Sequence, residues 1–396
     1  MTQNTDFTAI VAGGGPAGLA AAILLATEGV RTALITPESR SDPRTIALMA
    51  PSIRLLQHIG LWPGTLKEKT APLQGLEIVD DTGNLVQAPR LTFAASEVGE
   101  EAFGWNLPLD LLIPALVARA AEAGVTTITA RCLSARNDAE AIAVTLDNGQ
   151  TVTARVALAA DGANSALREA AGIPVERWSY DQDAFVTSFS HTADHRNFSV
   201  ETHKRNGAFT TVPLPGRASA LVWMDRPARI REVAALPDAD LAAEIQAELH
   251  GSLGLIANLG PRRAFPMRGM RPTVWAARRT LLIGEAAHLF PPIGAQGLNM
   301  SLRDAAHAAD LVAGSADPGA DSVMKEFDDL RKGDLWLRQS AIGFMNTSLL
   351  SAVAPLDLAR VAGLALVRAL PPVREWIMRE GLAPNASLPY AMRKRA

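Results

Sequence analysis

The feature that most constrains the fold of this 396-residue chain is the glycine-rich stretch that ends at residue 18. It begins as a short apolar run over 8–12 and continues into Gly13, Gly15 and Gly18, which stand in the G-x-G-x-x-G spacing. In such a turn the first glycine allows a tight bend, the second lets a pyrophosphate approach the backbone, and the third lets the next helix pack closely on the strand. The stretch therefore predicts a dinucleotide site, with the N–H groups at the helix start aimed at the phosphates.

The residues after this turn complete a βαβ unit. A stretch rich in Leu and Ala predicts a helix over 16–28, and a second apolar run predicts a strand over 31–36. The acidic residue that holds a ribose hydroxyl in such units is expected at the end of the second strand. Thr36 stands there instead, and Glu38 follows two residues later. Either side chain can hydrogen-bond the ribose, and the sequence leaves open which one does.

The charge balance and the cysteine content exclude several classes of protein. The formal net charge is −3, whereas nucleic-acid-binding proteins usually carry a strong basic excess, so no nucleic-acid partner is predicted. The single cysteine, Cys132, excludes a disulfide framework and the paired thiols of a flavin disulfide reductase. Cys132 is better explained as a small buried apolar side chain. No metal site is predicted.

Targeting and membrane signals are weak. The polar residues 1–7 lead directly into the first strand, which predicts no signal or transit peptide and a cytoplasmic protein. No stretch approaches the roughly 18 uninterrupted apolar residues that a membrane span requires. The region 348–382 is strongly apolar, so membrane contact is expected at the surface at most, on the inner face of the membrane.

Apolar periodicity and turn residues predict the remaining elements. A helix over 50–60 carries Ile53, Leu56 and Ile59 on one side. From 184 to 225 polar and apolar residues alternate, which predicts an antiparallel sheet inserted between segments of the dinucleotide domain. The other predicted elements are a hairpin with strands 75–79 and 85–88, a helix over 108–123, strands over 142–146, 151–160 and 280–283, one helix over 238–250, and helices after 296.

Two further stretches repeat the order strand, acidic residue, loop and helix. Asp161 and Gly162 end an apolar strand, where Asp161 either serves the cofactor or caps the following helix. Glu285 ends another strand, and its carboxylate can accept hydrogen bonds from sugar hydroxyls. The loop 291–297 then exposes backbone N–H groups at a helix start, which would stabilise negative charge on a reduced ring.

Taken together, these motifs resemble those of the flavin-dependent aromatic hydroxylases of the p-hydroxybenzoate hydroxylase type. The resemblance rests on the glycine fingerprint, on the Asp-Gly motif with Arg168, and on Gly-Glu-Ala-Ala-His followed by Pro-Ile-Gly-Ala-Gln-Gly-Leu-Asn. Residues 42–48, 208–223 and 298–304 most resemble the ubiquinone-biosynthesis hydroxylases, and the similarity covers nearly the whole chain.

Three residues depart from the family pattern. Thr36 replaces the acidic ribose partner, Glu285 stands where Asp is usual, and Ala295 stands where Gly is usual. Glu285 keeps the carboxylate on a longer side chain, whereas Ala295 adds a methyl group beside the flavin.

The resemblance implies an α/β fold, with a Rossmann-like FAD-binding domain, an inserted antiparallel β-sheet substrate domain and C-terminal helices. A single FAD would lie across the strand ends, and NADPH or NADH would bind transiently as co-substrate because only one fingerprint is present. The reduced flavin would capture O₂ as a C4a-hydroperoxide and hydroxylate the aromatic ring of a polyprenylated phenol in ubiquinone biosynthesis. The implied segments are 1–72, 106–176 and 273–316 for the FAD-binding domain, 73–105 for a substrate-domain hairpin, 177–272 for the substrate-domain sheet, and 317–396 for the C-terminal helices.

The resemblance also implies the site residues. None is expected to be catalytic, because the cofactor carries the chemistry. His288 could act as a base, but a structural histidine is the favoured interpretation. Arg44 contacts an FAD phosphate or the nicotinamide, or it is a surface arginine. The residues expected to bind FAD are Gly13, Gly15, Pro16, Ala17, Gly18, Thr36, Glu38, Arg44, Asp161, Gly162, Glu285, Pro292, Gly294, Gln296, Gly297, Leu298 and Asn299.

Two other functions share these features. An FAD-dependent reductase of prenyl double bonds would use the same fold, and a flavin-binding subunit of a ubiquinone-biosynthesis complex would need no catalysis. For any prenylated substrate, the apolar side chains between 349 and 378, with arginines such as Arg374, are a candidate membrane-docking surface. The alternative is that these helices pack on the protein's own core or on a partner subunit.

Overall fold

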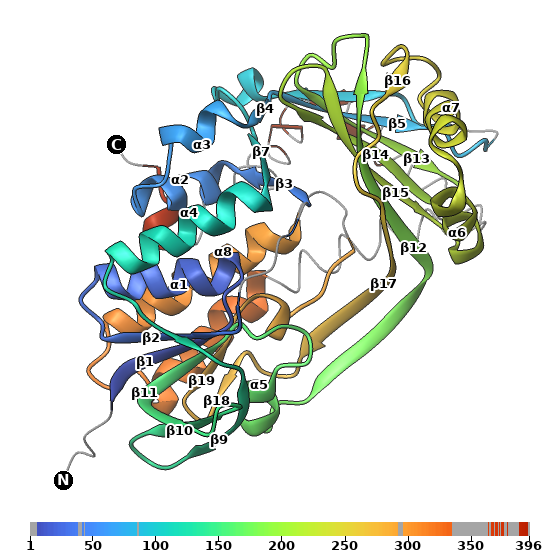
Figure 1. Ribbon diagram of the computed structural model, residues 1–396. Coiled ribbons are helices and arrows are strands. Elements are labelled where there is room, and N and C mark those ends of the chain that lie inside the picture. The colour runs from blue at the N-terminus through green and yellow to red at the C-terminus, as the bar shows by residue number, and fades with distance from the viewer. Residues whose placement is uncertain are drawn as a thin grey trace.

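The computed structural model describes residues 6–38, 42, 44–84, 87–291, 296–334 and 388–394, together with single residues between 363 and 378. Figure 1 shows two halves, one layered around a mostly parallel sheet and one built on a large curved sheet. The long strands β12 (Val175–His191) and β17 (Arg263–Pro272) run from the first half into the second.

The first sheet brings the ends of the predicted motif strands together. β1 (Phe7–Ala12) lies between β2 (Thr32–Thr36) and β11 (Thr151–Ala159), and β11 pairs with β19 (Thr280–Leu282), all in parallel. Because the last residues of these four strands are in register, their carboxyl ends meet at one edge, which is where ligands bind in open α/β sheets. The other strands of this sheet are β8 (Thr126–Thr129), β9 (Cys132–Asn137), β10 (Ile142–Leu146) and β18 (Ala276–Ala277).

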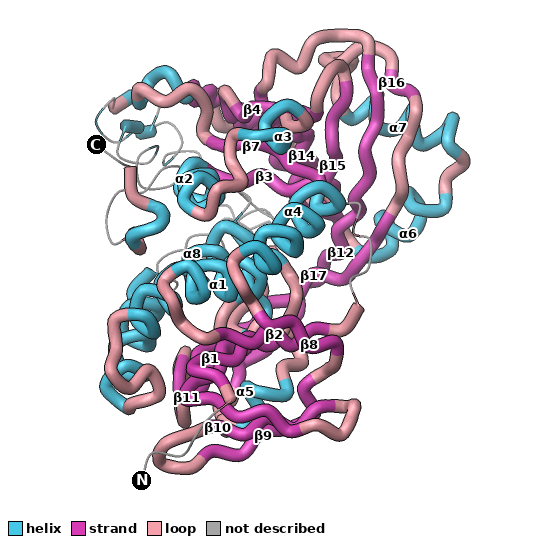
Figure 2. The backbone as a smooth tube through the Cα atoms, turned by 60° about the vertical axis from the view of Figure 1, so that its left-hand side comes forward, coloured by secondary structure: helices cyan, strands magenta, loops and turns pink. Residues whose placement is uncertain are grey.

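Helices cover this sheet with apolar side chains. α1 (Pro16–Thr27) is apolar on nearly all sides, and it is buried because it packs against both α4 (Leu109–Glu122) and α8 (Gln296–Ala313). Figure 2 shows these three helices together above the sheet. The predicted amphipathic helix is α2 (Ala50–His58), and its predicted apolar side is buried, as expected. The short helices α3 (Gly64–Glu68) and α5 (Ala166–Ala170) complete this half.

The second sheet has the strand order β16-β12-β15-β14-β13-β5-β6, with β17 beside β12. Alternation along the strands sends Phe185, Phe189 and Trp223 to one face, where they form a core with apolar residues of α6 (Pro227–Ala235) and α7 (Asp238–Glu248). The opposite face is turned toward the first half (Figure 1). Besides β12 and β17, the strands of the second sheet are β5 (Gly75–Asp80), β6 (Leu91–Ala94), β13 (Phe198–Lys204), β14 (Gly207–Leu214), β15 (Ala218–Asp225) and β16 (Ile256–Ala257).

The predicted hairpin after β5 is wrong in its second strand. β5 pairs with β6, which begins only at Leu91, and residues 87–88 are not in a strand. The reason is the Asp80 carboxylate, which accepts hydrogen bonds from Thr82 at 2.8 Å and from the N–H of Ala88 at 2.7 Å and so closes a longer loop. The strand that pairs with β5 therefore begins later in the chain than predicted.

Two further expectations for this half need correction. β5 joins the sheet through a parallel pairing with β13, so the sheet is not purely antiparallel. Two helices, α6 and α7, follow β15 where one was predicted, since Pro227 starts a separate helix at the position where proline is tolerated. The boundaries of the six predicted segments remain predictions.

A small sheet joins the two halves. It consists of β3 (Thr45–Met49), β4 (Ala71–Leu73) and β7 (Gly104–Pro108), in the order β3-β7-β4. Asn106 of β7 is fully buried and donates from Nδ2 to the carbonyl oxygen of Pro213 in β14, at 2.9 Å. The small sheet is therefore tied directly to the second sheet.

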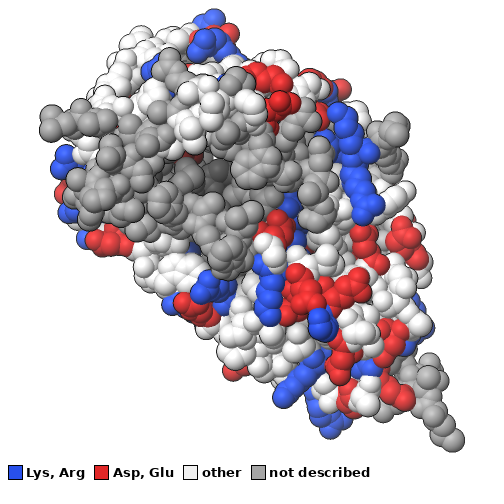
Figure 3. Space-filling model, turned by 180° about the vertical axis from the view of Figure 1, so that it is seen from behind, with Lys and Arg blue, Asp and Glu red and all other residues white. Residues whose placement is uncertain are grey.

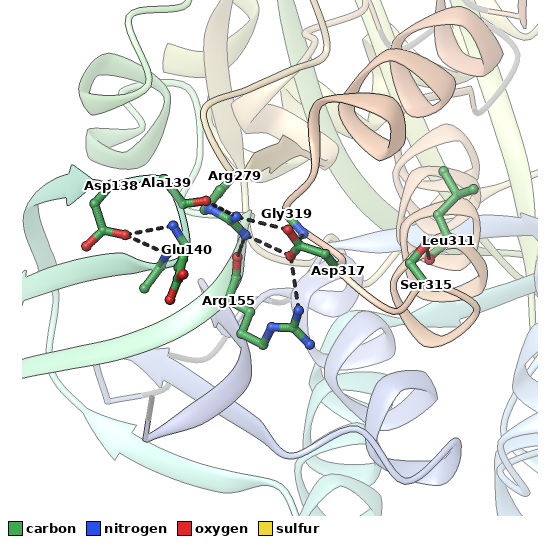
Figure 4. A network of polar contacts seen from close by, with 10 residues as sticks. Asp138, Ala139, Glu140, Arg155, Arg279, Leu311, Ser315, Asp317 and Gly319 are labelled. Carbon is green, nitrogen blue, oxygen red and sulfur yellow. Dashed lines mark hydrogen bonds and ion pairs between the residues drawn. The ribbon is translucent and has the colours of Figure 1, made fainter. Parts of the chain in front are cut away.

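A buried arginine fixes the far edge of the first sheet (Figure 4). Arg279 lies in the two-residue turn between β18 and β19, and both turn residues have positive φ. Its guanidinium pairs with both carboxylate oxygens of Asp317, at 2.9 and 3.0 Å, and donates to the carbonyl oxygens of Ala139 and Arg155. This contact ties the loop after α8 to the turn between β9 and β10, well away from the carboxyl edge.

The C-terminal docking prediction falls largely outside the described residues. Among those described, Leu366 and Leu370 are 52% and 43% exposed, as docking requires. Met378 is buried against Met49, Leu73 and neighbouring apolar side chains, so its assignment to a docking surface is wrong. Of the described helices, none is long and apolar enough to cross a membrane. On the rear face, Lys and Arg lie interspersed with Asp and Glu (Figure 3).

Candidate cofactor site

The three fingerprint glycines have the distinct surroundings that a dinucleotide turn requires. Gly13 has φ +116°, and a side chain there would overlap the carbonyl oxygen of Ala160. A side chain at Gly18 would overlap the carbonyl oxygen of Gly13. Gly15 is different, because it has an ordinary extended backbone and a Cβ there would meet no atom within 4 Å. Space is thus open at the one position where a pyrophosphate is expected to approach.

Open space at Gly15 continues into the start of α1. Gly15 is the N-cap of this helix and Pro16 is its first residue, so no side chain caps the first N–H groups. Ala17 and Gly18 follow in the first turn and are buried. Uncapped N–H groups together with the helix dipole favour a negatively charged group at this end.

The two candidate ribose partners lie at the end of β2 beside the glycine turn. The Thr36 hydroxyl donates to the carbonyl oxygen of Pro37 at 3.0 Å, and its side chain fills the space in front of Gly14. Glu38 is exposed, two residues beyond the strand. Both therefore lie at the predicted place.

The Asp-Gly motif packs against this turn. One carboxylate oxygen of Asp161 accepts from the N–H groups of Ala166 and Leu167, at 2.9 and 3.3 Å, and so serves the first turn of α5. Its other oxygen, Oδ1, is buried and has no hydrogen-bond partner in the described structure. Binding to the start of α5 therefore uses only Oδ2 of Asp161, and Oδ1 stays available to accept a hydrogen bond from a ligand. Gly162 follows with φ +87° and open space around it.

Arg168 connects the second motif to the third. It is buried in α5 and donates to the carbonyl oxygens of Ala163 and Ala286, at 2.8 and 2.7 Å. Burial and the nearby Arg177 lower its pKa, although a guanidinium remains charged at neutral pH. Arg168 thus holds the loop after β11 against the loop after β19.

Glu285 is exposed between buried neighbours in the third motif. The preceding Gly284 lies close to Ala17 of the first motif and to Ser301 of α8, because a Cβ on Gly284 would be 3.5 Å from each. The glycine turn, the Asp-Gly motif and the Glu285 loop therefore converge at the carboxyl edge of the first sheet.

Arg44 lies within electrostatic reach of Glu285. Its guanidinium binds the Asp42 carboxylate through Nε at 2.9 Å and Nη2 at 2.6 Å, while half of the side chain stays exposed. Hydrogen bonding to Asp42 raises the pKa of Arg44, and Glu285 adds to that increase. Arg44 is thus half-exposed and paired with Asp42, and its contact with an FAD phosphate or the nicotinamide stays a prediction.

The fourth group of predicted residues surrounds the start of α8. Pro292 and Gly294, like Ala295, lie outside the described residues. Gln296 is the first helical residue, Gly297 is exposed with open space around it, and Leu298 packs on the core.

The side chain of Asn299, also predicted to bind FAD, forms hydrogen bonds within the protein. It donates to the carbonyl oxygen of Ala47 at 2.8 Å and accepts from the N–H of Met49 and the hydroxyl of Ser52, at 2.8 and 2.7 Å. Asn299 therefore ties the start of α8 to β3 and α2.

His288 has the structural role that was favoured. Its Nε2 lies 2.7 Å from Oδ2 of Asp304, and both side chains are buried. Asp304 also accepts from the N–H of Gly284 at 3.0 Å and from Nε of the fully buried Arg331 at 2.8 Å. Burial alone would raise the pKa of Asp304, but Arg331 and His288 outweigh it and hold that pKa below its ordinary value. This network supports the Glu285 loop from behind.

Cys132 carries no reactive thiolate. Burial, with Asp161 and Asp147 nearby, raises its pKa to about 12, so the thiol stays protonated at neutral pH. No group of metal-ligating side chains occurs in the part of the chain that the structure describes.

Sequence reasoning missed two buried pairs of polar side chains. Asp304 and Arg331 support the third motif from α8 and from the helical residues 321–334, and Glu201 and His203 form a buried pair on β13. The second pair had a usable signal, since two residues at i and i+2 in an alternating strand share one face.

Comparisons with known proteins agree with this geometry. The family model described as "FAD binding domain" matches residues 6–331. Ubiquinone hydroxylase UbiL of Rhodospirillum rubrum is 32% identical, covering 96% of this chain and 91% of the relative. The 3-demethoxyubiquinol 3-hydroxylase of Escherichia coli is 28% identical, covering 99% of this chain and 100% of the relative. The structure of p-nitrophenol 4-monooxygenase PnpA from Pseudomonas putida has a TM-score of 0.74 at 18% identity, covering 95% and 98%, which shows a shared fold.

Proposed function

We propose a function for this chain from its family, since it belongs to the FAD-binding-domain family and within it to the ubiquinone-biosynthesis hydroxylases. It uses FAD, NAD(P)H and O₂ to hydroxylate the aromatic ring of a polyprenylated phenol in ubiquinone biosynthesis. The observation that best supports this proposal is the convergence of three cofactor motifs at one sheet edge, opposite the inserted sheet. An aromatic substrate would lie between that edge and the sheet.

The described residues fit FAD. The open space at Gly15 and the uncapped start of α1 suit a pyrophosphate, and the unpartnered Oδ1 of Asp161 suits a hydroxyl donor. We propose that Glu285 binds ribityl hydroxyls and that Thr36 or Glu38 binds the adenosine ribose. Bound FAD supplies the redox chemistry with NAD(P)H and O₂. The protein's own task is to orient the ring and the substrate and to exclude water.

Replacing Glu285 by glutamine should weaken FAD binding without unfolding the protein. Glu285 is exposed in the described structure, so its replacement leaves no buried group without a partner. Loss of a charged hydrogen bond to a hydroxyl costs about 1.5–3 kcal/mol, which corresponds to roughly a 10- to 150-fold loss of affinity. Fluorescence titration of apoprotein with FAD measures this change. Glu140→Gln, in the turn between β9 and β10, is the matched exposed control, and equal affinities in both variants would remove Glu285 from the site.

Steady-state turnover with a short-tailed prenylphenol tests the function itself. Hydroxylation predicts NAD(P)H oxidation that the phenol stimulates and a product with one added oxygen atom. A product with two added hydrogens instead would indicate a prenyl reductase. Flavin binding with no NAD(P)H oxidation for any prenylphenol would favour a non-catalytic subunit of a complex.

We also propose that the enzyme collects its substrate at a membrane surface, because a polyprenyl tail is too apolar to stay in water. The exposed Leu366 and Leu370 support contact with lipid. Arg374 adds little to the attraction for anionic lipid headgroups, because its positive charge is already paired with the Glu97 carboxylate at 2.7 Å. Sedimentation with anionic vesicles is the direct measurement.

A further inference from the structure

A buried glutamate–histidine pair lies on β13, outside the cofactor motifs. The Nε2 atom of His203 is 2.8 Å from Oε1 of Glu201, and their side chains are only 3% and 8% exposed. The other ring nitrogen of His203, Nδ1, is buried and has no hydrogen-bond partner in the described structure. A buried polar atom left without a partner is uncommon in a folded protein and calls for an explanation.

The pairing determines which ring nitrogen can accept a proton. An ionised carboxylate only accepts hydrogen bonds, so Nε2 of a neutral His203 carries the hydrogen that it donates to Glu201. Nδ1 then keeps a free lone pair, which is a hydrogen-bond acceptor and a base. A carboxylate that orients a histidine in this way also stabilises the imidazolium that forms when the ring takes up a proton.

The face of the sheet on which His203 lies is the one turned toward the cofactor half. Lys204, the next residue, pairs with Glu248 of α7 on the opposite face. His203 is in register with Ala208 of β14, which packs in a small apolar cluster. Phe290 packs against that cluster. Phe290 lies two residues after His288, which ends the third cofactor motif. The pair therefore lies on the same face of the second sheet as this cluster, against which Phe290 of the chain after the third motif packs.

Given the proposed function, on which this inference rests, we propose that Glu201 and His203 bind the hydroxyl group of the phenol substrate and remove its proton. The proton moves from the phenol oxygen to Nδ1 of His203, which gives a phenolate and an imidazolium that the Glu201 carboxylate neutralises. No oxidant takes part in this step. A phenolate ring is richer in electrons than a phenol ring, so it reacts more readily with an electrophilic oxygen, and the proton returns to the product oxygen afterwards.

His191 provides a matched control on the same sheet. It is also buried, but on the α6 and α7 face, and both of its ring nitrogens have partners. Nδ1 lies 2.8 Å from the carbonyl oxygen of Ala193, and Nε2 lies 3.0 Å from the hydroxyl of Ser219. With no free nitrogen and no access to the cofactor half, His191 cannot act on a substrate there.

The test measures the ionisation state of a bound phenol in the FAD-loaded protein. The probe is a short-tailed prenylphenol with a ¹³C label at the hydroxyl-bearing ring carbon, whose NMR resonance separates phenol from phenolate without interference from flavin absorbance. Spectra are recorded at a pH where the free probe is neutral. The variants are His203→Gln, which keeps an amide donor for Glu201, Glu201→Gln, and the control His191→Gln; retained FAD reports that each is folded.

The proposal predicts a phenolate resonance for the probe bound to the parent protein and to His191→Gln, and a neutral resonance in His203→Gln. Glu201→Gln should give an intermediate result, and kcat for hydroxylation should fall about 10²- to 10⁴-fold in His203→Gln. A neutral bound phenol in the parent, or an unchanged phenolate resonance in His203→Gln, would overturn the proposal. If the parent protein hydroxylates phenols but the NMR resonances differ from those expected, only the role of Glu201 and His203 is refuted. If the parent binds no phenol at all, the proposed function fails as well.

Discussion

A Gly15→Val variant is expected to fold normally and to lose FAD. The backbone at Gly15 has φ −74° and ψ 171°, an extended conformation that any residue adopts, and a Cβ there meets nothing within 4 Å. The substitution therefore introduces neither strain nor overlap in the apoprotein. The valine side chain would occupy the space where the pyrophosphate must approach the backbone. We expect FAD affinity to fall by more than about 100-fold, equivalent to roughly 3 kcal/mol, in a protein whose apo melting temperature is nearly unchanged.

Gly13→Ala is the contrasting variant. The added Cβ would overlap the carbonyl oxygen of Ala160, and φ +116° is unfavourable for alanine, so this variant should be destabilised as an apoprotein. Far-UV circular dichroism and thermal melts of both apoproteins, followed by FAD titration, separate the two effects. Tight FAD binding by Gly15→Val would show that the open space is not the pyrophosphate position.

An Arg331→Met variant is expected to lose about 3–5 kcal/mol of stability, the typical effect of breaking a buried ion pair. Arg331 is fully buried and binds Asp304 at 2.8 Å and Asp334 at 3.0 Å. Without the guanidinium, Asp304 would be a buried carboxylate with only His288 and the N–H of Gly284 as partners. Urea unfolding of the apoprotein measures the change.

The pH dependence of this variant identifies the cause. In the parent, Asp304 has a lowered pKa, so its contribution to stability is complete above the ordinary aspartate pKa and is lost as the pH falls below it. In Arg331→Met the guanidinium that lowers the pKa of Asp304 is gone, while burial still raises it, so this pKa should be higher than in the parent. As the pH falls, the free energy of unfolding should therefore begin to decrease at a higher pH than in the parent. Adding Asp304→Asn removes the uncompensated charge and should restore most of the stability. A double variant as unstable as the single one would contradict this explanation.

The same substitution should weaken FAD binding indirectly. Asp304 fixes the N–H of Gly284, and Gly284 precedes Glu285 and packs against Ala17 of the fingerprint helix. A shift of this loop would move Glu285 away from its place beside the other motifs. The buried network thus links the stability of the apoprotein to the shape of the cofactor site.

The parts of the site that could be predicted from sequence are those with local causes. Gly13, Gly15 and Gly18 each answer a steric need within one βαβ unit, and parallel strands then bring Asp161 and Glu285 to the same edge. Asn299 was correctly placed at the start of α8, but its side chain binds β3 and α2. That outcome depends on packing between segments 250 residues apart, which local patterns do not encode.

The two buried pairs, Arg331 with Asp304 and Glu201 with His203, could not be located in the same way. Arg331 reaches Asp304 from 27 residues away, and nothing in either local sequence marks the other as its partner. For Glu201 and His203 the spacing was informative, but their burial depends on which face of the second sheet is turned toward the cofactor half. The hairpin after β5 failed for a related reason, because the Asp80 side chain, rather than the turn residues alone, determines the length of the loop.

The central claim is that this chain is an FAD-dependent monooxygenase, and the origin of the added oxygen tests it most directly. Purified holoprotein is supplied with NAD(P)H and a short-tailed prenylphenol under O₂ enriched in the heavy oxygen isotope, and the product is analysed by mass spectrometry. We expect a ring-hydroxylated product that contains one heavy oxygen atom, with none gained when the label is in water instead. A product without isotope from O₂, or one that has gained only hydrogen, would contradict the account.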